Sequence, residues 1–325
     1  MADITNASIP KESKILAVTT DILYDVLILG GGPAGLTAAV YIMRKGLSAA
    51  LLTKNIGGQV IETAGIENYM GYRYIEGTDL IKKFFEQIKQ FPIAFKEGIH
   101  ATKLSKESGI FHVTCSDGET YRTKTLIIAT GKSPRRLNVR GEKEFTGKGV
   151  AYCTICDAPL YAGLTTAVIG GGNSAIESAI DLCKICKEVH VIQLLPELTA
   201  DKVLIRKLNE FNNFTIHYNC KLRAIKGDRL VTSIDVARND SDEIFSLDVD
   251  GVFVAVGLIP NTDYLKGFLA LNEFNEIVID ANCNTSVDGV FSAGDATSIR
   301  VKQIIVAAGE GAKAALASHQ YLLGN

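Results

Sequence analysis

Short apolar runs separated by glycine-rich turns dominate the hydrophobic pattern of this chain. Tyr24–Leu29 is such a run, rich in aliphatic side chains, and it predicts a strand buried on both faces of a parallel sheet. Gly30–Gly35 follow, and Leu36–Lys45 then forms an alanine-rich segment of helical length. Ala49–Thr53 predicts a second buried strand. Together these segments predict a βαβ unit in which a glycine loop opens the helix.

The same order recurs further along the chain. Thr166–Ile169 predicts a strand, Gly170–Ala175 a second glycine loop that opens a helix, and Val189–Gln193 the returning strand. Two nucleotide-binding domains in an α/β fold are therefore expected. The other predicted elements are an arm at residues 1–23, an amphipathic helix at Thr78–Gln90, a β-meander between Ile93 and Tyr121 with a turn at Ser116–Glu119, strands at Thr125–Ala129, Phe214–Tyr218, Val231–Ala237 and Val252–Val256, and a basic, glycine-rich linker at Lys132–Gly149.

The first glycine loop matches the G-x-G-x-x-G pattern of dinucleotide-binding domains. Its first glycine permits a tight turn, its second lets a pyrophosphate approach the backbone, and its third lets the helix pack on the strand. The strand after the helix ends without an acid for a ribose 2′-hydroxyl, so Thr53 is the candidate for that role. A glycine-rich turn without a ligand is the alternative. The candidate pyrophosphate-binding residues are Gly30, Gly32, Pro33, Ala34 and Gly35.

The second loop matches G-x-G-x-x-A in the same setting. Two dinucleotide sites on one chain suggest one flavin and one nicotinamide nucleotide. The strand after this loop ends at Gln193 with no arginine cluster for a 2′-phosphate, so NADPH is disfavoured and Gln193 offers an amide to the 2′-hydroxyl of NADH. Loss of nucleotide binding at this loop is the alternative. The candidate residues are Gly170, Gly172, Asn173, Ser174 and Ala175.

The cysteines form two pairs with C-x-x-C spacing. Cys153 and Cys156 are followed by Asp157, and this spacing lets two thiols close a small reducible ring while the acid exchanges a proton. Cys183 and Cys186 fall at the end of the helix after the second glycine loop, where buried, unreactive thiols are expected. The two pairs lie too far apart for a zinc ribbon, so no metal site is predicted. The isolated cysteines, expected to be structural, are Cys115, Cys220 and Cys283.

Composition narrows the class of protein. The 325 residues exceed the roughly 250–300 at which one core stops growing. The 34 Lys and Arg against 36 Asp and Glu give a net charge of −2, which disfavours a nucleic-acid binder. No apolar run approaches the ~20 residues of a membrane span, and no secretory signal is recognisable. An odd count of seven cysteines argues against a disulfide scaffold, so a reducing, cytoplasmic location is expected.

From about Tyr24 onward the chain resembles the low-molecular-weight thioredoxin reductases, the class II pyridine nucleotide-disulfide oxidoreductases. The resemblance rests on the glycine loops and on Cys153–Asp157, and within the family the second domain is similar to the reductase half of the alkyl hydroperoxide reductase flavoprotein subunit. Further matching segments are Gly57–Gln59, Glu67–Tyr69, Thr125–Gly131, Pro196–Leu204, Val256–Asn261, Thr285–Asp295 and Lys302–Val306.

The resemblance implies a three-layer α/β architecture in which an NAD(P)-binding domain, residues 138–262, is inserted into an FAD-binding domain made of residues 1–137 and 263–325. By the same resemblance Asp295 holds the flavin ribityl chain, and Gln303 and Ile304 contact the isoalloxazine ring. The other flavin-contacting candidates are Gly58, Gln59, Asn68, Thr130, Gly131 and Gly294.

The activity that the resemblance implies is that of an FAD-dependent thioredoxin-disulfide reductase, acting as a homodimer. A donor reduces FAD, and the flavin reduces the Cys153–Cys156 disulfide, with Cys156 nearer the flavin. Cys153 then attacks a disulfide of a thioredoxin-like or glutaredoxin-like protein, while Asp157 handles the proton. The inserted domain is expected to rotate between these steps about hinges near Lys132–Arg140 and Asn261–Asp263.

The sequence leaves more than one candidate for the electron donor and for the function. NADPH-specific members have an H-R-R-x-x-x-R pattern where this chain has Gln193 and no arginine through Thr199, which favours NADH, with reduced ferredoxin as the other possible donor. A non-enzymatic flavoprotein redox sensor would contain the same motifs, whereas a ferredoxin–NADP reductase would not need the cysteine pair. The basic residues near the predicted linker, which suit either an acidic partner or a solvated surface, are Lys132, Arg135, Arg136 and Arg140. No nucleic-acid or membrane partner is expected.

Overall fold

The computed structural model describes residues 15–63, 65–241 and 243–324. Contacts divide the chain into two compact units, and each is described by itself. The first comprises the described residues of 1–61, 78–133 and 260–325, and the second those of 62–77 and 134–259. Residues 1–14 of the predicted arm lie outside the described residues. The rest of the arm begins with Leu16, whose N–H donates to the Ile93 carbonyl at 2.9 Å beside the edge of the first unit's sheet.

A seven-stranded sheet forms the centre of the first unit, in the order β3-β2-β1-β6-β5-β4, with β17 also paired to β6. The strands β3, β2, β1, β6 and β17 are parallel, and β4, β5 and β6 form the antiparallel meander that the alternating pattern predicts. The apolar run predicted as a separate strand at Thr125–Ala129 is instead the second half of β6, which pairs first with β5 and then with β17. The strands are β1 (Leu23–Gly31), β2 (Ala49–Ile56), β3 (Ala94–Glu97), β4 (Ala101–Glu107), β5 (Ile110–Cys115), β6 (Thr120–Ile128) and β17 (Val290–Ser292).

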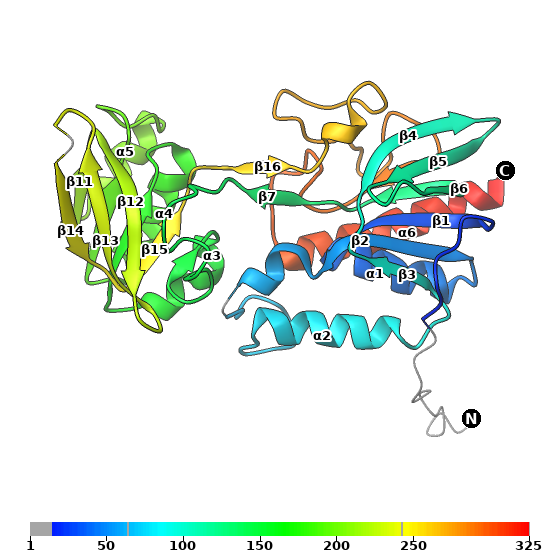
Figure 1. Cartoon of the computed structure of the whole chain (residues 1–325), viewed down its shortest axis with the longest axis horizontal. Helices are drawn as coiled ribbons and strands as arrows, with labels where there is room; N and C mark the ends of the chain where they lie inside the picture. The colour runs from blue at the N-terminus through cyan, green and yellow to red at the C-terminus, as the bar shows by residue number, and fades with distance from the viewer. Residues whose placement is uncertain (1–14, 64, 242, 325) are drawn as a thin grey trace. The chain divides into compact units, whose positions relative to one another are not determined.

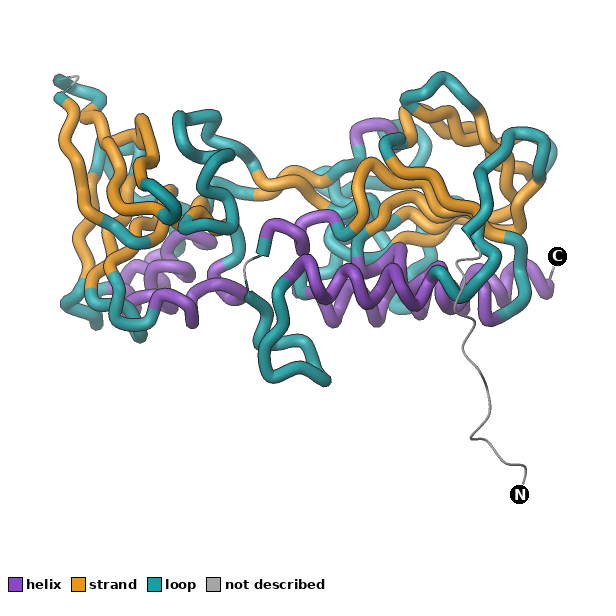
Figure 2. Tube along the Cα trace, turned by 60° about the horizontal axis from the view of Figure 1, so that its bottom comes forward, coloured by secondary structure: helices purple, strands orange, loops and turns teal. Residues whose placement is uncertain are grey.

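Helices α1 (Pro33–Arg44) and α6 (Ile304–Gly324) cross in close contact on one face of this sheet (Figure 1). Small residues make the crossing possible: a Cβ atom at Gly311 of α6 would collide with the Ala34 carbonyl of α1. In Figure 2 the long helices of this unit lie on one side of its strands. The remaining elements of this part of the chain are α2 (Gly77–Ile88) and the short helices η2 (Gly58–Glu62) and η4 (Asp263–Leu265).

The second unit has three layers around a fully parallel sheet, in the order β11-β10-β9-β15-β8. Helix α4 packs on one face through an apolar core that includes Ile176 and Ile180, and an antiparallel sheet, β12-β13-β14, covers the other face. The elements are β8 (Val150–Ala151), α3 (Thr154–Asp157), η3 (Ala158–Tyr161), β9 (Thr165–Ile169), α4 (Asn173–Cys183), β10 (Glu188–Ile192), α5 (Lys202–Leu208), β11 (Phe214–His217), β12 (Cys220–Gly227), β13 (Val231–Arg238), β14 (Ile244–Asp248) and β15 (Gly251–Val254).

The chain passes between the units on either side of the segment 62–77, and again at the paired strands β7 (Lys132–Pro134) and β16 (Leu258–Pro260). The units therefore divide between residues 133 and 134 and between residues 259 and 260, a few residues before the predicted boundaries at 137/138 and 262/263. The segment 62–77, which the predicted boundaries assign to the FAD-binding domain, has its contacts with the second unit. The functional assignment of the two domains stays a prediction.

Candidate cofactor and redox sites

The first glycine loop joins β1 to α1. Gly30 has a φ of +113°, and a Cβ atom there would collide with the Ala129 carbonyl, so this position requires glycine. Gly35 approaches the Gly30 carbonyl equally closely, which lets the first turn of α1 pack on β1. At Gly32, directly before α1, an added Cβ would meet no atom within 4 Å. The backbone at the helix N-terminus is therefore open, as a bound pyrophosphate requires.

Thr53, the predicted ribose partner, is 4% exposed at the end of β2. Its hydroxyl donates to the Asn55 carbonyl at 2.6 Å. The hydroxyl proton is therefore used within the loop, and Thr53 can only accept a hydrogen bond from a ribose hydroxyl.

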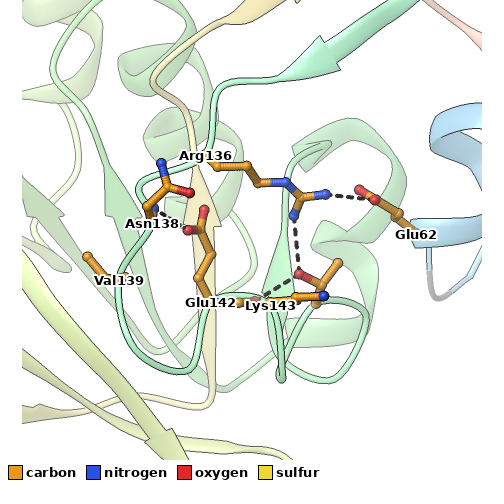
Figure 3. Close-up of a pocket in the computed structure, with 7 residues that line it drawn as sticks. Glu62, Arg136, Asn138, Val139, Glu142 and Lys143 are labelled. Carbon is orange, nitrogen blue, oxygen red and sulfur yellow. Dashed lines mark hydrogen bonds and ion pairs between the residues drawn. The ribbon is translucent and has the colours of Figure 1, made fainter. Parts of the chain in front are cut away.

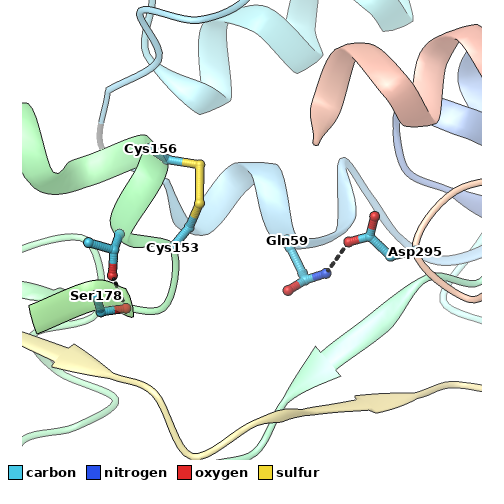
Figure 4. Close-up of a disulfide and its surroundings, with 6 residues drawn as sticks. Gln59, Cys153, Cys156, Ser178 and Asp295 are labelled. Carbon is cyan, nitrogen blue, oxygen red and sulfur yellow. Dashed lines mark hydrogen bonds between the residues drawn. A yellow bond between two sulfur atoms is a disulfide. The ribbon is translucent and has the colours of Figure 1, made fainter. Parts of the chain in front are cut away.

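Two predicted flavin-contacting residues that are distant in sequence meet in the first unit. Gln59 Nε2 donates to Asp295 Oδ2 at 3.2 Å (Figure 4). Asp295 follows Gly294, whose φ is +78° and whose N–H donates to Glu310 Oε2 at 2.8 Å. Burial raises the pKa of Asp295, and the charges of Lys302 and Lys132 oppose that rise. The turn that presents Asp295 is thus fixed from behind by a buried carboxyl group of α6.

The other predicted flavin contacts lie at element ends. Thr130 and Gly131 follow β6, and the Thr130 hydroxyl donates to the Asn261 carbonyl at 3.0 Å. Gln303 and Ile304 stand at the start of α6, where the Gln303 carbonyl accepts the Ala307 N–H at 2.9 Å. Asn68 is different, because it lies in the segment 62–77, which belongs to the second unit. Asn68 therefore lies in a different unit from the other predicted flavin-contacting residues.

The second glycine loop repeats the geometry of the first between β9 and α4. Gly170 has a φ of +132°, and a Cβ atom there would lie 3.2 Å from Ala175 Cβ, which takes the place of the third glycine. At Gly172 an added Cβ would meet only Thr199 Oγ1, at 3.7 Å. Ser174 is exposed in the first turn of α4. This loop also leaves room for a phosphate at a helix N-terminus.

The segment after β10 folds back onto this loop. The Thr199 N–H donates to the Gly171 carbonyl at 2.9 Å. Asn173 and Asp201 form a reciprocal pair, in which Asn173 Nδ2 donates to Asp201 Oδ2 at 2.9 Å and Asn173 Oδ1 accepts the Asp201 N–H at 2.8 Å. Gln193 is 4% exposed, and its Nε2 donates to the Glu197 carbonyl at 2.8 Å. One of its amide donors is therefore used by the protein, a restraint that residue type alone does not reveal.

Cys153 and Cys156 form a disulfide in the second unit, with their Cα atoms 5.4 Å apart (Figure 4). Cys153 directly precedes α3, and the Cys156 and Asp157 N–H groups donate to its carbonyl at 3.2 and 3.1 Å. Thr154 Oγ1 donates to Ser178 Oγ of α4 at 2.7 Å, which fixes α3 on the helix that follows the second glycine loop. Asp157 is 4% exposed. A reducible bond and a buried acid thus share one short helix.

A family of known enzymes combines these features. The sequence model described as "Pyridine nucleotide-disulphide oxidoreductase" matches residues 24–311. The chain belongs to this family. The resemblance inferred from the motifs is confirmed, as is the α/β fold with two Rossmann-like domains.

Relatives within the family extend the comparison. The chain is 44% identical over 302 residues to the F subunit of alkyl hydroperoxide reductase from Staphylococcus aureus and 43% identical to a protein named NADH dehydrogenase of Ferdinandcohnia aciditolerans. These matches cover 93% of this chain but only 60% and 58% of the relatives, so the chain spans about three fifths of their length.

Solved structures of the same family are also similar. The thioredoxin reductase of Streptococcus pyogenes is 33% identical, with a TM-score of 0.89 over 94% of this chain and 100% of that one. The thioredoxin reductase of Giardia duodenalis is 32% identical, with a TM-score of 0.85 over 92% of this chain and 99% of that one.

The second cysteine pair of this family member is buried. Cys186 Sγ donates to the Tyr161 carbonyl at 3.3 Å, and burial raises the pKa of Cys183 to about 11. Burial also raises the pKa of Cys186 and so favours the protonated, less nucleophilic form of both thiols. Within the described part of the chain, no group of three or more His, Cys, Asp or Glu side chains could hold a metal ion. The described helices include none that is both long and apolar enough to cross a bilayer.

Sequence reasoning missed a charged cluster in the first unit. Lys132, which suited a solvated linker or a docking surface by sequence, is buried against Glu276 with a nitrogen–oxygen distance of 2.7 Å. Lys302 approaches the same carboxylate. No sequence signal could have found this cluster, because Lys132 and Glu276 are 144 residues apart.

Proposed function

We propose that this chain is an FAD-dependent disulfide reductase of the thioredoxin reductase type. The first unit holds FAD, the second binds a nicotinamide nucleotide with NADH preferred to NADPH, and the Cys153–Cys156 pair passes electrons to a thioredoxin-like or glutaredoxin-like protein. The observation on which this proposal depends is the disulfide on α3, in the same unit as an open nucleotide loop.

The first unit fits FAD on its own residues. The open backbone at Gly32 suits a pyrophosphate, and the Gln59–Asp295 pair offers a carboxylate and an amide to the hydroxyl groups of a ribityl chain. FAD, when bound, supplies the two-electron transfer between a nicotinamide and a disulfide. The resemblance assigns Asp295, Gln303 and Ile304 to this cofactor, and each lies in the first unit.

The preference for NADH follows from the segment after β10. Gln193 and the next seven residues, Leu194–Ala200, contain no cation to neutralise a 2′-phosphate, and Glu197 adds a negative charge. The relative named NADH dehydrogenase supports the same choice of nucleotide. A 2′-hydroxyl needs no cation and can bond to the remaining polar atoms of the Gln193 amide.

The cysteine pair and its acid perform the thiol chemistry. Two electrons and two protons convert the Cys153–Cys156 disulfide to two thiols. The Cys153 thiolate then attacks a partner disulfide, which releases one partner thiolate and leaves a mixed disulfide. Cys156 displaces the second partner thiolate and restores the original bond. Asp157, adjacent to Cys156, takes and returns the proton. Ile155 is 64% exposed beside the disulfide and can contact the partner protein.

An anaerobic reduction experiment tests the proposal. The purified chain is loaded with FAD, and flavin bleaching is followed after mixing with NADH, NADPH or reduced ferredoxin. We expect bleaching with NADH to be the fastest, followed by catalytic reduction of oxidised thioredoxin. Bleaching by ferredoxin alone would contradict the nicotinamide assignment, and a single turnover would indicate a redox sensor.

Matched serine variants test the dithiol step. Cys153→Ser should abolish thioredoxin reduction while its flavin still bleaches with NADH, because only the exchange step is lost. Cys183→Ser alters a buried cysteine of the second pair and should keep turnover. A Cys153→Ser enzyme that reduces thioredoxin would refute the mechanism.

A further inference from the structure

Lys132, Glu276 and Lys302 form a buried charged cluster in the first unit. Lys132 Nζ lies 2.7 Å from Glu276 Oε1, and Lys302 Nζ lies 3.4 Å from the same oxygen. The three side chains are only 11%, 12% and 18% exposed. Removing charges from water costs several kcal/mol per ion, so such a cluster needs a compensating role or geometry.

Glu276 and Lys302 use more of their hydrogen-bonding capacity within the protein than Lys132 does. The second Glu276 oxygen accepts from Asn272 Nδ2 at 2.8 Å, and Lys302 Nζ also donates to the Thr297 carbonyl at 2.6 Å. An ammonium has three donors, and in the described part of the chain Lys132 Nζ bonds only to Glu276. Two N–H groups of a mostly buried Lys132 thus remain available to an acceptor.

The cluster lies beside the predicted flavin contacts. Both lysine charges act on Asp295, whose pKa they lower against the effect of burial. Lys302 directly precedes Gln303, and Lys132 directly follows Gly131, two residues predicted to contact the flavin. The positive charge therefore reaches the part of the first unit where the cofactor is expected.

We infer that Lys132 is a further cofactor-binding residue, whose ammonium, held by Glu276, stabilises bound flavin more in its reduced form than in its oxidised form. This inference depends on the proposed binding of FAD by the first unit. Two electrons and one proton convert the neutral isoalloxazine ring to a monoanion, so the ring gains one negative charge. A fixed cation nearby favours that change, and a fixed anion opposes it.

Two neutralising variants have opposite expected effects. Lys132→Met removes a positive charge and should shift the flavin reduction equilibrium about tenfold toward the oxidised form, which is roughly 30 mV for a two-electron couple. Glu276→Gln removes a negative charge and should shift it toward the reduced form. The double variant and Lys132→Arg should both lie near the wild-type value. The equilibrium is measured by dithionite titration of the FAD-loaded chain against a reference dye.

Opposite signs separate an electrostatic role from structural damage. Loss of packing would weaken FAD binding or thermal stability in both variants, but it would not move the equilibrium in two directions. Lys124→Met is the matched control, because Lys124 forms an ion pair with Asp25 in the same unit but is 50% exposed. Its equilibrium should stay at the wild-type value.

The outcomes distinguish this inference from the proposed function. If FAD binds and Lys132→Met leaves the equilibrium unchanged, or shifts it in the same direction as Glu276→Gln, the inference is overturned while the proposed function stands. If the wild-type chain takes up no FAD in a titration, the proposed function fails, and the role of Lys132 fails with it.

Discussion

Replacement of Glu142 by Gln should destabilise the second unit strongly. Glu142 is 3% exposed, and its carboxylate accepts three hydrogen bonds. Oε1 accepts the Leu137 N–H and the Tyr152 hydroxyl, each at 2.9 Å, and Oε2 accepts the Asn138 N–H at 2.7 Å. Arg136 donates to the Tyr152 hydroxyl at 2.6 Å, so a cation stands one group away (Figure 3 shows the Arg136 and Glu142 side chains).

The magnitude follows from counting acceptors. A Gln at this position has one acceptor oxygen, so its NH₂ group must face at least one of the donors that now bond to Glu142. An unsatisfied buried donor costs about 1–3 kcal/mol, and the remaining bonds lose the strengthening effect of the charge. Tyr152 does not compensate by ionising, because burial, followed by its bond to Glu142, raises its pKa to about 12. We expect a total loss of about 2–4 kcal/mol in the free energy of unfolding.

Thermal unfolding followed by circular dichroism measures this loss. For a unit of this size the midpoint should fall by roughly 5–12 °C. Glu144→Gln is the matched control, because it makes the same chemical change at an exposed position two residues away. A Glu142→Gln midpoint within about 1 °C of the wild type, or an equal loss in Glu144→Gln, would refute the reasoning.

Three further predictions follow from buried groups. Burial lowers the pKa of His190 and His217 in the folded protein, so the unfolded chain takes up protons first as the pH falls through about 6.5. The urea concentration at the unfolding midpoint should therefore drop between about pH 8 and pH 5.5. The drop should be smaller in the H190Q/H217Q variant. Glu310→Leu should cost about 1–3 kcal/mol of unfolding free energy because the Gly294 N–H loses its acceptor, whereas Glu310→Gln keeps one; equal losses in urea unfolding would contradict this. Cys183 should resist alkylation by iodoacetamide in the folded protein, and a modified Cys183 peptide in mass spectrometry would show that it is accessible.

The hydrophobic pattern predicted the strands well where both faces are buried. In β1 the run from Val26 to Leu29 is at most 2% exposed, so the continuous apolar run and the buried strand coincide. The pattern was less informative where a strand changes its environment, as in β6, whose first half alternates between partly exposed and buried positions and whose last four residues are all buried. A local pattern records the burial of each segment but not whether two segments form one strand.

The linker prediction at Lys132–Gly149 holds only at its start, where β7 passes between the units, because residues 134–149 belong to the second unit. Polar and glycine-rich composition is typical of solvated connections, but here Glu142 accepts two backbone N–H groups of the same segment and orders it. The segment also lines an open cavity of about 570 Å³ that includes no residue of the glycine loops or the cysteine pair. Composition could not show that one acidic side chain turns inward, because that depends on the position of Tyr152 in the fold.

The two glycine loops have similar sequence motifs, and the structure adds how each loop contacts the segment that follows it. Their backbones are built alike, with positive φ at Gly30 and Gly170 and open space before each helix. In both loops a backbone N–H of the following segment donates to the carbonyl of the second glycine, from Gly57 to Gly31 at 2.7 Å and from Thr199 to Gly171 at 2.9 Å. The second loop adds a side-chain pair between Asn173 and Asp201, at the position where the first loop has Pro33. Under the proposed function, we expect nucleotide choice in the second unit to depend on this whole segment and not on Gln193 alone. A variant that introduces arginines after Gln193 should improve NADPH binding only if it also keeps the bonds that hold this segment against the loop.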